Sequence, residues 1–578
     1  MKKLYIITGI VMVAILLLGC GGRDAEPGRS LDDLGYDPDG LPIVEEEVSY
    51  RIVAPKNALA LDYNDMLIFE QMEEDTNVNI EWENLGEESF EATRNLILAD
   101  RNNLPDAMYH AGFSDRDVIQ YSAAKTILPF DEYLEYMPNF SRILEERPDI
   151  ERIITAPDGH IYALPRVEEM GLLQHPNLLF LNKAWVNRLS DAGYIVDEDG
   201  SPFTVEISGG GLADASTEDD IQLDELTIEV DGEPVDGLRV DQYGAILRAI
   251  RENADFLSDA DNVIPLTFVF NGWQGNQSDL YAAFGIPENT DHRTVIDDEV
   301  VFTATLDAFK DATNYYSDWV DQGLIDREVF TQGDMDLLAK GKGDHQRLGS
   351  FYWWEKETVV KPEWYDDYVA MPPLIGRNGE QIVGVSNNQE ISKGNFVVFD
   401  KAENPEVLMS WIDRFYDPTI SAQINYGPIG IVYEEERDDE GRLVQKPIPE
   451  GMTADELRLR NAPMGIVYLT DEQWGNDLVM EYRARLRLEI LDEYADPYVP
   501  EDVRQYPNVT FELEEINDIN RYASDIYDYI FQQQSTWLLE GGVTDQEWDD
   551  YVDQLERMGL NEMIDSFQSA YDRYQETG

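Results

Sequence analysis

Two hydrophobic periodicities alternate along the chain from residue 48 onward. Val48–Val53 and Val78–Trp82 alternate apolar and polar residues, as half-buried strands do, and Asp106–Tyr109 resembles a short buried strand. Asp65–Asp75 and Phe90–Ala99 instead carry apolar residues at helical spacing. This β-α-β-α-β order predicts a parallel sheet with helices on both faces, and such sheets bind ligands at the carboxyl ends of their strands.

The rest of the chain predicts further elements of both kinds and no internal repeat. Residues 196–240 are acidic and interrupted by Gly, which predicts an inserted surface excursion with small hairpins. The last hundred residues are mainly helical in pattern, with a capping box at Thr544–Glu547. Strands are expected at 265–270, 347–354 and 396–399, and helices at 241–253, 306–322 and 405–416.

The N-terminus predicts export and a lipid anchor. Two Lys precede an apolar run of residues 4–18, which is too short to span a bilayer, and Gly19 and Cys20 follow. Leu17–Cys20 resembles the bacterial lipobox, which implies removal of residues 1–19 and lipidation of Cys20, including palmitate. A plain signal peptide or an anchor helix is the alternative. Residues 20–46 lack hydrophobic periodicity and predict a flexible tether.

Composition excludes several classes of function. The 578 residues include 117 Asp and Glu against 43 Lys and Arg, for a formal net charge of −74. A nucleic-acid partner is not expected, because binding a polyanion requires clustered Lys and Arg. The single Cys excludes an internal disulfide framework. We interpret the excess of acidic residues as an adaptation to high salt or alkaline pH.

The sequence contains few motifs of catalysis or cofactor binding. It has no Walker A motif, no His-Glu-x-x-His and no Gly-x-Ser-x-Gly. Asp197, Asp199, Gly200 and Glu206 imitate part of an EF-hand loop, but Ile195 would occupy its first ligand position and cannot bind calcium. We therefore expect no metal, no cofactor and no catalytic residue.

Aromatic and amide side chains cluster where two predicted strands end. Asn271, Trp273 and Gln274 follow the first strand, and Tyr352, Trp353 and Trp354 end the second. Sugar rings present apolar C–H faces that pack on aromatic rings and hydroxyls that pair with amides, so these groups suit a carbohydrate. The alternative is that these aromatic residues pack in the core.

Three stretches together resemble the extracellular solute-binding proteins of family 1, the sugar-binding lipoproteins of ABC transporters, and within them the LipO-like group. The first stretch is Leu104–Tyr109 with Ile127–Phe130. The second is Ala156–Pro165 with Leu179–Lys183, similar to the hinge crossover of sugar-binding proteins. The third lies in the tail, with Trp548, Tyr551, Leu555 and Gly559 ahead of residues 570–574. The resemblance covers essentially the whole chain after Cys20. The acidic excursion departs from it, and Asp255–Val263 lacks the spacing of the calcium loop that related proteins carry.

The resemblance implies an α/β, two-lobed periplasmic-binding-protein-like fold of type II, with the ligand cleft between the lobes. Lobe 1 is expected to consist of residues 47–168 and 376–438, and lobe 2 of residues 169–375 and 439–578. The crossovers between them are expected near residues 165–175, 373–380 and 435–445.

The resemblance also implies which residues face the ligand. Lobe 1 would contribute Tyr109 and His110, and Asn388 and Tyr426 on its second pass, with Arg166 and Glu168 at the hinge. Asn271, Trp273 and Gln274 would come from lobe 2, together with Tyr352, Trp353 and Trp354.

The function that this resemblance implies is capture of an oligosaccharide outside the cytoplasm. A monomer, anchored to the cell membrane by its lipid, would deliver the sugar to the permease subunits of an ABC importer, and the chain itself would not be an enzyme. Two alternatives stay open. One is a surface-anchored hydrolase or lyase, and the other is a receptor of the same fold for a non-sugar solute such as a peptide.

Overall fold

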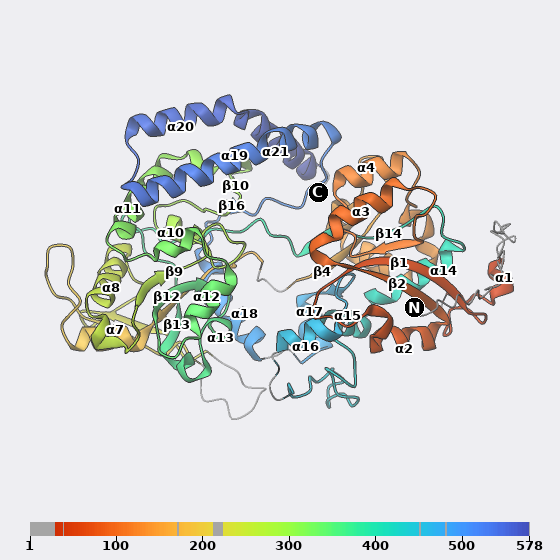
Figure 1. Ribbon diagram of the computed structural model, residues 1–578, viewed down its shortest axis with the longest axis horizontal. Coiled ribbons are helices and arrows are strands. Elements are labelled where there is room, and N and C mark those ends of the chain that lie inside the picture. Colours follow the sequence, from red (N-terminus) through yellow and green to blue (C-terminus); the bar gives the residue numbers. More distant parts are fainter. Residues whose placement is uncertain are drawn as a thin grey trace, which may run out of the picture.

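The chain forms two α/β lobes that lie side by side, with a layer of C-terminal helices over lobe 2 (Figure 1). This computed structural model describes residues 29–38, 40–169, 173–211, 223–449, 452, 454–479 and 482–576. The signal peptide and Cys20 lie outside the described residues, as does part of the expected tether. Within the described part of the chain, no helix is both long and apolar enough to cross a membrane.

Lobe 1 is built on a six-stranded sheet with the strand order β15-β4-β14-β3-β1-β2. Its strands are β1 (Val48–Lys56), β2 (Val78–Gly86), β3 (Ala107–Tyr109), β4 (Leu164–Glu168), β14 (Ile391–Val398) and β15 (Tyr468–Leu469). Strand β1 pairs in parallel with both β2 and β3, which confirms the predicted β-α-β-α-β unit. Strand β14 runs antiparallel to both of its neighbours, so a late segment of the chain occupies the middle of the sheet.

Helices cover both faces of this sheet. One face bears a large core that includes Ile52, Tyr109, Trp411 and Phe415. The opposite face bears a smaller core that includes Met108 and Val397. The helices of lobe 1 are α2 (Leu67–Thr76), α3 (Phe90–Ala99), α4 (Asp115–Ala123), α5 (Pro138–Glu146), α6 (Pro148–Ile154), α14 (Pro405–Asp413), α15 (Pro418–Tyr426), α16 (Ala454–Asn461) and α17 (Asp471–Asn476). A one-turn helix, α1 (Leu31–Leu34), packs against the larger core through Leu34.

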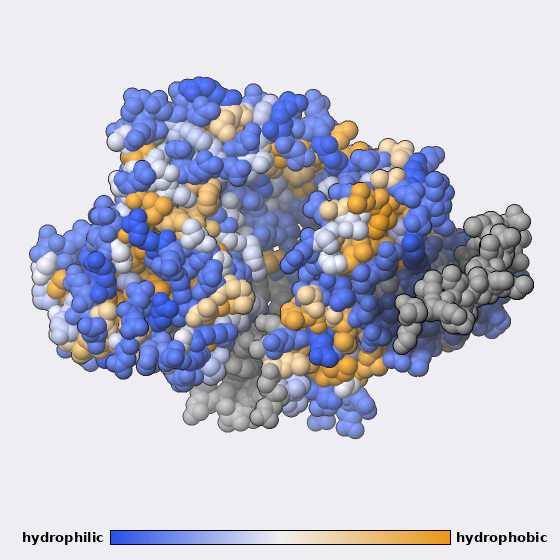
Figure 2. All heavy atoms as spheres, viewed as in Figure 1, coloured by the Kyte–Doolittle hydropathy of each residue, from blue (hydrophilic) through white to orange (hydrophobic). Residues whose placement is uncertain are grey.

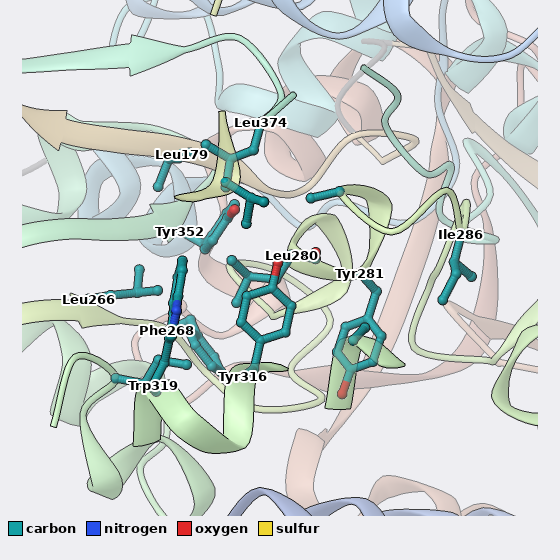
Figure 3. Packing of buried hydrophobic residues seen from close by; sticks show 14 of the residues in the cluster. Leu179, Leu266, Phe268, Leu280, Tyr281, Ile286, Tyr316, Trp319, Tyr352 and Leu374 are labelled. Atoms are coloured by element: carbon teal, nitrogen blue, oxygen red, sulfur yellow. Dashed lines mark hydrogen bonds between the residues drawn. The ribbon is translucent and has the colours of Figure 1, made fainter. Parts of the chain in front are cut away.

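Lobe 2 is built on a four-stranded sheet with the order β13-β5-β12-β9. The strands are β5 (Leu178–Asn182), β9 (Ile264–Thr267), β12 (Leu348–Trp353) and β13 (Tyr368–Met371), all of them entirely buried. Figure 3 shows Tyr352 of β12 among the side chains of this core, with Leu179 and Leu280 near it. The helices of lobe 2 are α7 (Lys183–Asp191), α8 (Val240–Glu252), α9 (Ala254–Leu257), α10 (Ser278–Ala282), α11 (Asp307–Asp321), α12 (Asp334–Gly341), α13 (Lys356–Val359) and α18 (Tyr482–Tyr494).

Two small antiparallel sheets extend lobe 2. The acidic excursion forms β6 (Val205–Ser208), β7 (Thr227–Val230) and β8 (Glu233–Val235), as its hairpin pattern predicts, although residues 212–222 lie outside the description. The second sheet joins β10 (Arg293–Ile296), β11 (Glu299–Phe302) and β16 (Val503–Arg504). Both sheets contribute apolar residues to the lobe 2 core.

The C-terminal layer consists of α19 (Leu513–Glu540), α20 (Asp545–Arg557) and α21 (Leu560–Glu576). Helix α20 begins with the predicted capping box, in which the Thr544 hydroxyl and the Glu547 carboxylate bond to each other's backbone N–H. Its apolar stripe buries Trp548, Tyr551 and Leu555 in the lobe 2 core, as expected.

The chain passes back from lobe 1 to lobe 2 later than at the expected boundary, residue 438. Leu457, Tyr468 and Leu478 all belong to the larger lobe 1 core, whereas Leu486 packs in lobe 2. The chain therefore leaves lobe 1 after Leu478 and not near 435–445, because α16, β15 and α17 complete its core. The second crossing also lies later than 373–380, since the Val385 carbonyl still accepts a hydrogen bond from the Asn289 side chain of lobe 2.

Replacing Gly394 with Ala should destabilise lobe 1. This residue of β14 has φ +75°, and a Cβ there would lie 2.0 Å from the carbonyl oxygen of Phe113. We expect a loss of about 2 kcal/mol or more in the free energy of unfolding, because the left-handed backbone and the overlap both cost energy. The control is Gly159→Ala, where φ is +88° and no atom lies within 4 Å of the added Cβ. Equal losses in urea unfolding for the two variants would contradict the argument from overlap.

Candidate functional site

The lobes meet along segments that cross between them, and the surface is hollowed there (Figure 2). The first crossing follows Glu168 and reaches lobe 2 at Leu178, and the second returns to lobe 1 at Ile391. A further segment, residues 505–511, runs beside the second crossing: the Gln505 side-chain amide donates to the carbonyl oxygens of Ser386 and Asn388, at 2.8 and 2.6 Å. Side chains on and beside these segments form the candidate site.

On the lobe 1 side, Glu168 is the centre of a hydrogen-bonded group, the Glu168 cluster, made of Arg166, Glu168, Asn425, Tyr426 and Arg458. One carboxylate oxygen of Glu168 accepts from the Tyr426 hydroxyl at 3.0 Å and from the Asn425 amide, and lies 3.6 Å from the Arg458 guanidinium. The other accepts from Arg166. The Arg458 guanidinium also lies 4.7 Å from the centre of the Tyr426 ring. The cluster thus joins the end of β4 to α15 and α16.

Charge sets the protonation states in and beside this cluster. Burial alone would raise the pKa of Glu168, but the positive charges of Arg166 and Arg458, with the hydrogen bonds, outweigh it and lower that pKa to about 2. Burial lowers the pKa of His110 to about 4, and the charge of Arg166 acts in the same direction. At neutral pH Glu168 is therefore anionic and His110 is neutral.

Arg166 retains hydrogen-bonding capacity for a ligand. Its two hydrogen bonds, to Glu168 and Asn425, both use Nη2, and among the described residues no partner takes Nε or Nη1. Its side chain remains 21% exposed at the end of β4. Guanidinium N–H groups held in place by a carboxylate suit the hydroxyl or ring oxygens of a sugar.

Replacing Arg166 with Gln should lower the affinity for an oligosaccharide about tenfold, because a hydrogen bond to a charged group contributes about 1.5–3 kcal/mol. Isothermal titration calorimetry measures the effect. The control is Arg142→Gln, since Arg142 forms an exposed i,i+4 pair with Glu146 on α5. An unchanged affinity in the Arg166 variant would show that the free nitrogens do not contact the sugar.

On the lobe 2 side, the loop from Asn271 to Gln277 lies against the first crossing. The backbone N–H of Gly275 donates to the Pro176 carbonyl at 3.2 Å, and that of Asn276 donates to the Asn177 side chain at 2.8 Å. The Asn271 and Gln277 amides bond to each other, which holds the loop in shape. Trp273 projects from this loop and is 52% exposed, the only Trp among the described residues that is mostly accessible. It can therefore offer a ring face to a ligand.

Several residues expected at the ligand are instead in the core. Tyr109, Tyr352 and Trp353 are at most 2% exposed, so those three predictions are wrong for this structure. Tyr109 packs between Trp82 and Phe415 because the last residue of β3 still faces the lobe 1 core. Tyr352 and Trp353 lie in the middle of the lobe 2 sheet, with both of its faces covered.

The remaining predicted residues lie near the crossings in different settings. Gln274 is 7% exposed, and its amide donates to Asp334 at 3.2 Å. The Trp354 ring packs 4.9 Å from the Arg487 guanidinium, on the lobe 2 side. Asn388 lies on the second crossing itself, where its backbone bonds with Ser386 and Gln505. Arg166, Glu168 and Tyr426 are the predicted residues that the structure joins, in the Glu168 cluster. His110 directly follows β3, where the charge of Arg166 acts on it.

Sequence reasoning missed Asn425 and Arg458, which complete the Glu168 cluster. They are 257 and 290 positions from Glu168 along the chain, and neither belongs to a motif that signals a site.

Among the described residues, no group of three or more His, Cys, Asp or Glu side chains is placed to hold a metal ion. In the partial EF-hand loop, Asp197 instead accepts hydrogen bonds from the N–H groups of Asp199 and Ser201.

Comparison with known proteins identifies full-length relatives. No protein-family model matches the chain. The chain is 28% identical over 587 aligned residues to the fructooligosaccharide ABC transporter substrate-binding protein FusA of Streptococcus pneumoniae, with 99% of each covered. The structure of FusA in complex with kestose matches with a TM-score of 0.76, over 92% of this chain and 100% of that one. An HMO-binding solute-binding protein of Bifidobacterium longum infantis, 20% identical, matches with a TM-score of 0.70 over 91% and 99% of the two chains, which supports the two-lobed fold.

Proposed function

We infer that this chain, a homologue of ABC-transporter substrate-binding proteins, captures an oligosaccharide between its lobes and delivers it to an ABC importer. One observation carries the inference: the chain matches, over 99% of its length in sequence and 92% in fold, a relative whose structure is known with bound kestose. The site is consistent with such a ligand, because it offers the free guanidinium nitrogens of Arg166 and the exposed ring of Trp273 on opposite sides of the first crossing.

Closure of the lobes around the sugar is the step that couples capture to transport in this proposal. Hinged domains close when a ligand makes contacts with both sides that the open state lacks. The Glu168 cluster belongs to lobe 1 and the Trp273 loop to lobe 2, so a sugar that contacts both would favour the closed state. The permease subunits would then read the closed form. In this proposal the chain catalyses no reaction and acts as a monomer.

The test is calorimetric titration of the protein with kestose and nystose, with maltotriose as the comparison sugar. We expect saturable binding of the fructooligosaccharides with no product released over hours, as judged by chromatography. A ligand present at 100 times its dissociation constant should also stabilise the fold by about 2.7 kcal/mol. Release of shortened sugars would favour a hydrolase, and binding of peptides but of no sugar would favour a receptor for a different solute.

We also propose that the protein is held outside the cytoplasm by a lipid on Cys20. The apolar run and the lipobox-like Leu17–Cys20 support this placement, and a tether of residues 20–46 would connect the lipid to lobe 1. Mass spectrometry of the N-terminal peptide from cells tests it, with Cys20→Ser as the control. An unmodified Cys20, or a mature N-terminus at another residue, would contradict the anchor.

A further inference from the structure

The C-terminal helix layer covers lobe 2 and also reaches lobe 1. Figure 1 shows α19 and α21 on the same side of the molecule as α4 of lobe 1, with α15 and α16 on the other side. The Arg116 guanidinium of α4 donates a hydrogen bond to the Asn517 side-chain oxygen of α19 at 2.6 Å. The Arg152 guanidinium of α6 donates to the Tyr574 hydroxyl of α21 at 3.0 Å and lies 4.1 Å from the centre of its ring. We call these two side-chain pairs the latch.

The latch is part of a wider contact between lobe 1 and the C-terminal layer. The partly buried Tyr574 packs against the lobe 2 core and also against the larger lobe 1 core, to which α6 contributes. Close to it, the Thr510 hydroxyl donates to the Ile153 carbonyl at 3.1 Å. At the start of α4, the Asp115 carboxylate accepts from the Phe511 backbone N–H at 3.1 Å. The contact therefore extends along lobe 1 from α4 to α6.

The latch lies on the other side of the crossings from the Glu168 cluster. That cluster joins β4 to α15, which packs on the larger lobe 1 core through Ala422. Helix α4, which carries Arg116, packs on the smaller core of the opposite face through Val118. Helix α6 lies next to α4, since Ile154 and Val118 line the same small hollow. A hinge motion that brings lobe 2 toward the Glu168 cluster must therefore draw α19 and α21 away from α4 and α6.

We propose that the latch holds the lobes apart, so that Arg116, Arg152 and Tyr574 set the affinity for the sugar without touching it. Contacts that exist only in the open position stabilise that position, and a ligand that selects the closed position then binds more weakly by the same factor. Arg116 and Asn517 are exposed, which keeps their pair weak enough to open and close reversibly. These are positioning residues, and the inference rests on the proposed function, because the sugar is the ligand whose affinity they set.

Removing the latch should strengthen sugar binding. The double variant Arg116→Ala/Arg152→Ala should bind kestose and nystose about three- to tenfold more tightly than the wild type, because closure no longer breaks these contacts. Calorimetric titration measures the change. The control is Arg142→Ala, which removes the same charge from α5 of lobe 1, where Arg142 pairs with Glu146 and no residue of lobe 2. It should bind both sugars as the wild type does.

The relative position of the lobes can be followed without any sugar. In a Cys20→Ser background, fluorescent labels are placed at Leu59→Cys and Met335→Cys, whose native side chains are 59% and 77% exposed. Leu59 lies in the loop after β1, and Met335 lies on α12, whose first residue Asp334 bonds to the Trp273 loop. Single-molecule energy transfer should show more molecules with a short label distance in the double variant than in the wild type.

The two measurements separate the latch from the proposed function. A shift toward short distances together with tighter sugar binding supports the latch. If the wild type binds these sugars but the double variant shows either no shift or no gain in affinity, the latch is overturned and the proposed function stands. If the wild type binds no oligosaccharide, the proposed function fails, and the label distances alone decide: a shift in the double variant supports a latch between the lobes, and identical distributions overturn it.

Discussion

Replacing Trp273 with Ala should weaken oligosaccharide binding by about 30-fold or more. A Trp that anchors a ligand commonly contributes about 2 kcal/mol or more, and 2 kcal/mol corresponds to about 30-fold in the dissociation constant. Trp273 is 52% exposed on a loop whose shape is held by the Asn271–Gln277 pair, so removing its ring deletes no core packing. Calorimetric titration with kestose measures the loss, and the melting temperature without sugar should stay within about 1 °C, as surface substitutions usually allow.

Two further variants make the Trp273 result specific. Trp273→Phe keeps a smaller ring and should recover part of the affinity, because the apolar face remains. Tyr194→Ala removes another exposed aromatic ring of lobe 2, one that packs 5.5 Å from Phe256 and contacts no crossing segment. It should bind sugar as the wild type does. Wild-type affinity in Trp273→Ala would remove this residue from the site.

Replacing Glu168 with Ala should lower the free energy of unfolding by about 3 kcal/mol or more. The side chain is 13% exposed, and its removal leaves Arg166 and Arg458 close together without their shared anion. Breaking a buried ion pair from one side costs about 3–5 kcal/mol, because the remaining charge stays desolvated. Urea unfolding measures the loss. The neighbouring Glu169→Gln is the control: Glu169 pairs with Arg147 at a more exposed position, where about 1 kcal/mol or less is expected.

The contribution of Glu168 should also depend on pH in a defined direction. Its pKa is lowered from 4.5 to about 2, so the folded state binds the proton less tightly than the unfolded state does. The stabilisation is complete above pH 4.5 and is lost as pH falls toward 2; the pKa difference corresponds to about 3 kcal/mol. The difference in stability between the wild type and Glu168→Gln should therefore shrink to about half between pH 6 and pH 3. A difference that stays constant or grows on acidification would contradict this assignment.

The sequence pattern was sufficient to predict the elements of lobe 1 that form locally. Strands β1 to β3 and helices α2 and α3 lie where the two periodicities placed them, because each needs only its own alternation of apolar and polar residues. The lobe boundaries depend on contacts between distant segments. Residues 454–478 carry a helical and strand pattern that would fit either lobe, and only their packing with the lobe 1 core decides the matter.

The sequence could place a residue in the candidate site only where the local pattern fixes both the position of the residue in the fold and the direction of its side chain. Arg166 and Glu168 lie at the end of β4, just before the first crossing, and their contact with a ligand stays a prediction. Tyr109 was misplaced because sequence does not reveal which face the last residue of a three-residue strand presents. Asn425 and Arg458 come from helices more than 250 residues away, and no local pattern signals that they meet Glu168.

The order of strands in the lobe 1 sheet has a consequence for how the protein matures. Strand β14 separates β3 from β4, and β15 at Tyr468–Leu469 forms the edge beyond β4, so the sheet cannot close until about four-fifths of the chain has been synthesised. Lobe 2 needs α21 at the very end. Such long-range pairing slows folding and leaves nascent apolar surface uncovered. A polypeptide that stops before the last helix should therefore complete the lobe 1 sheet, leave the core of lobe 2 uncovered and become a substrate for proteases and chaperones.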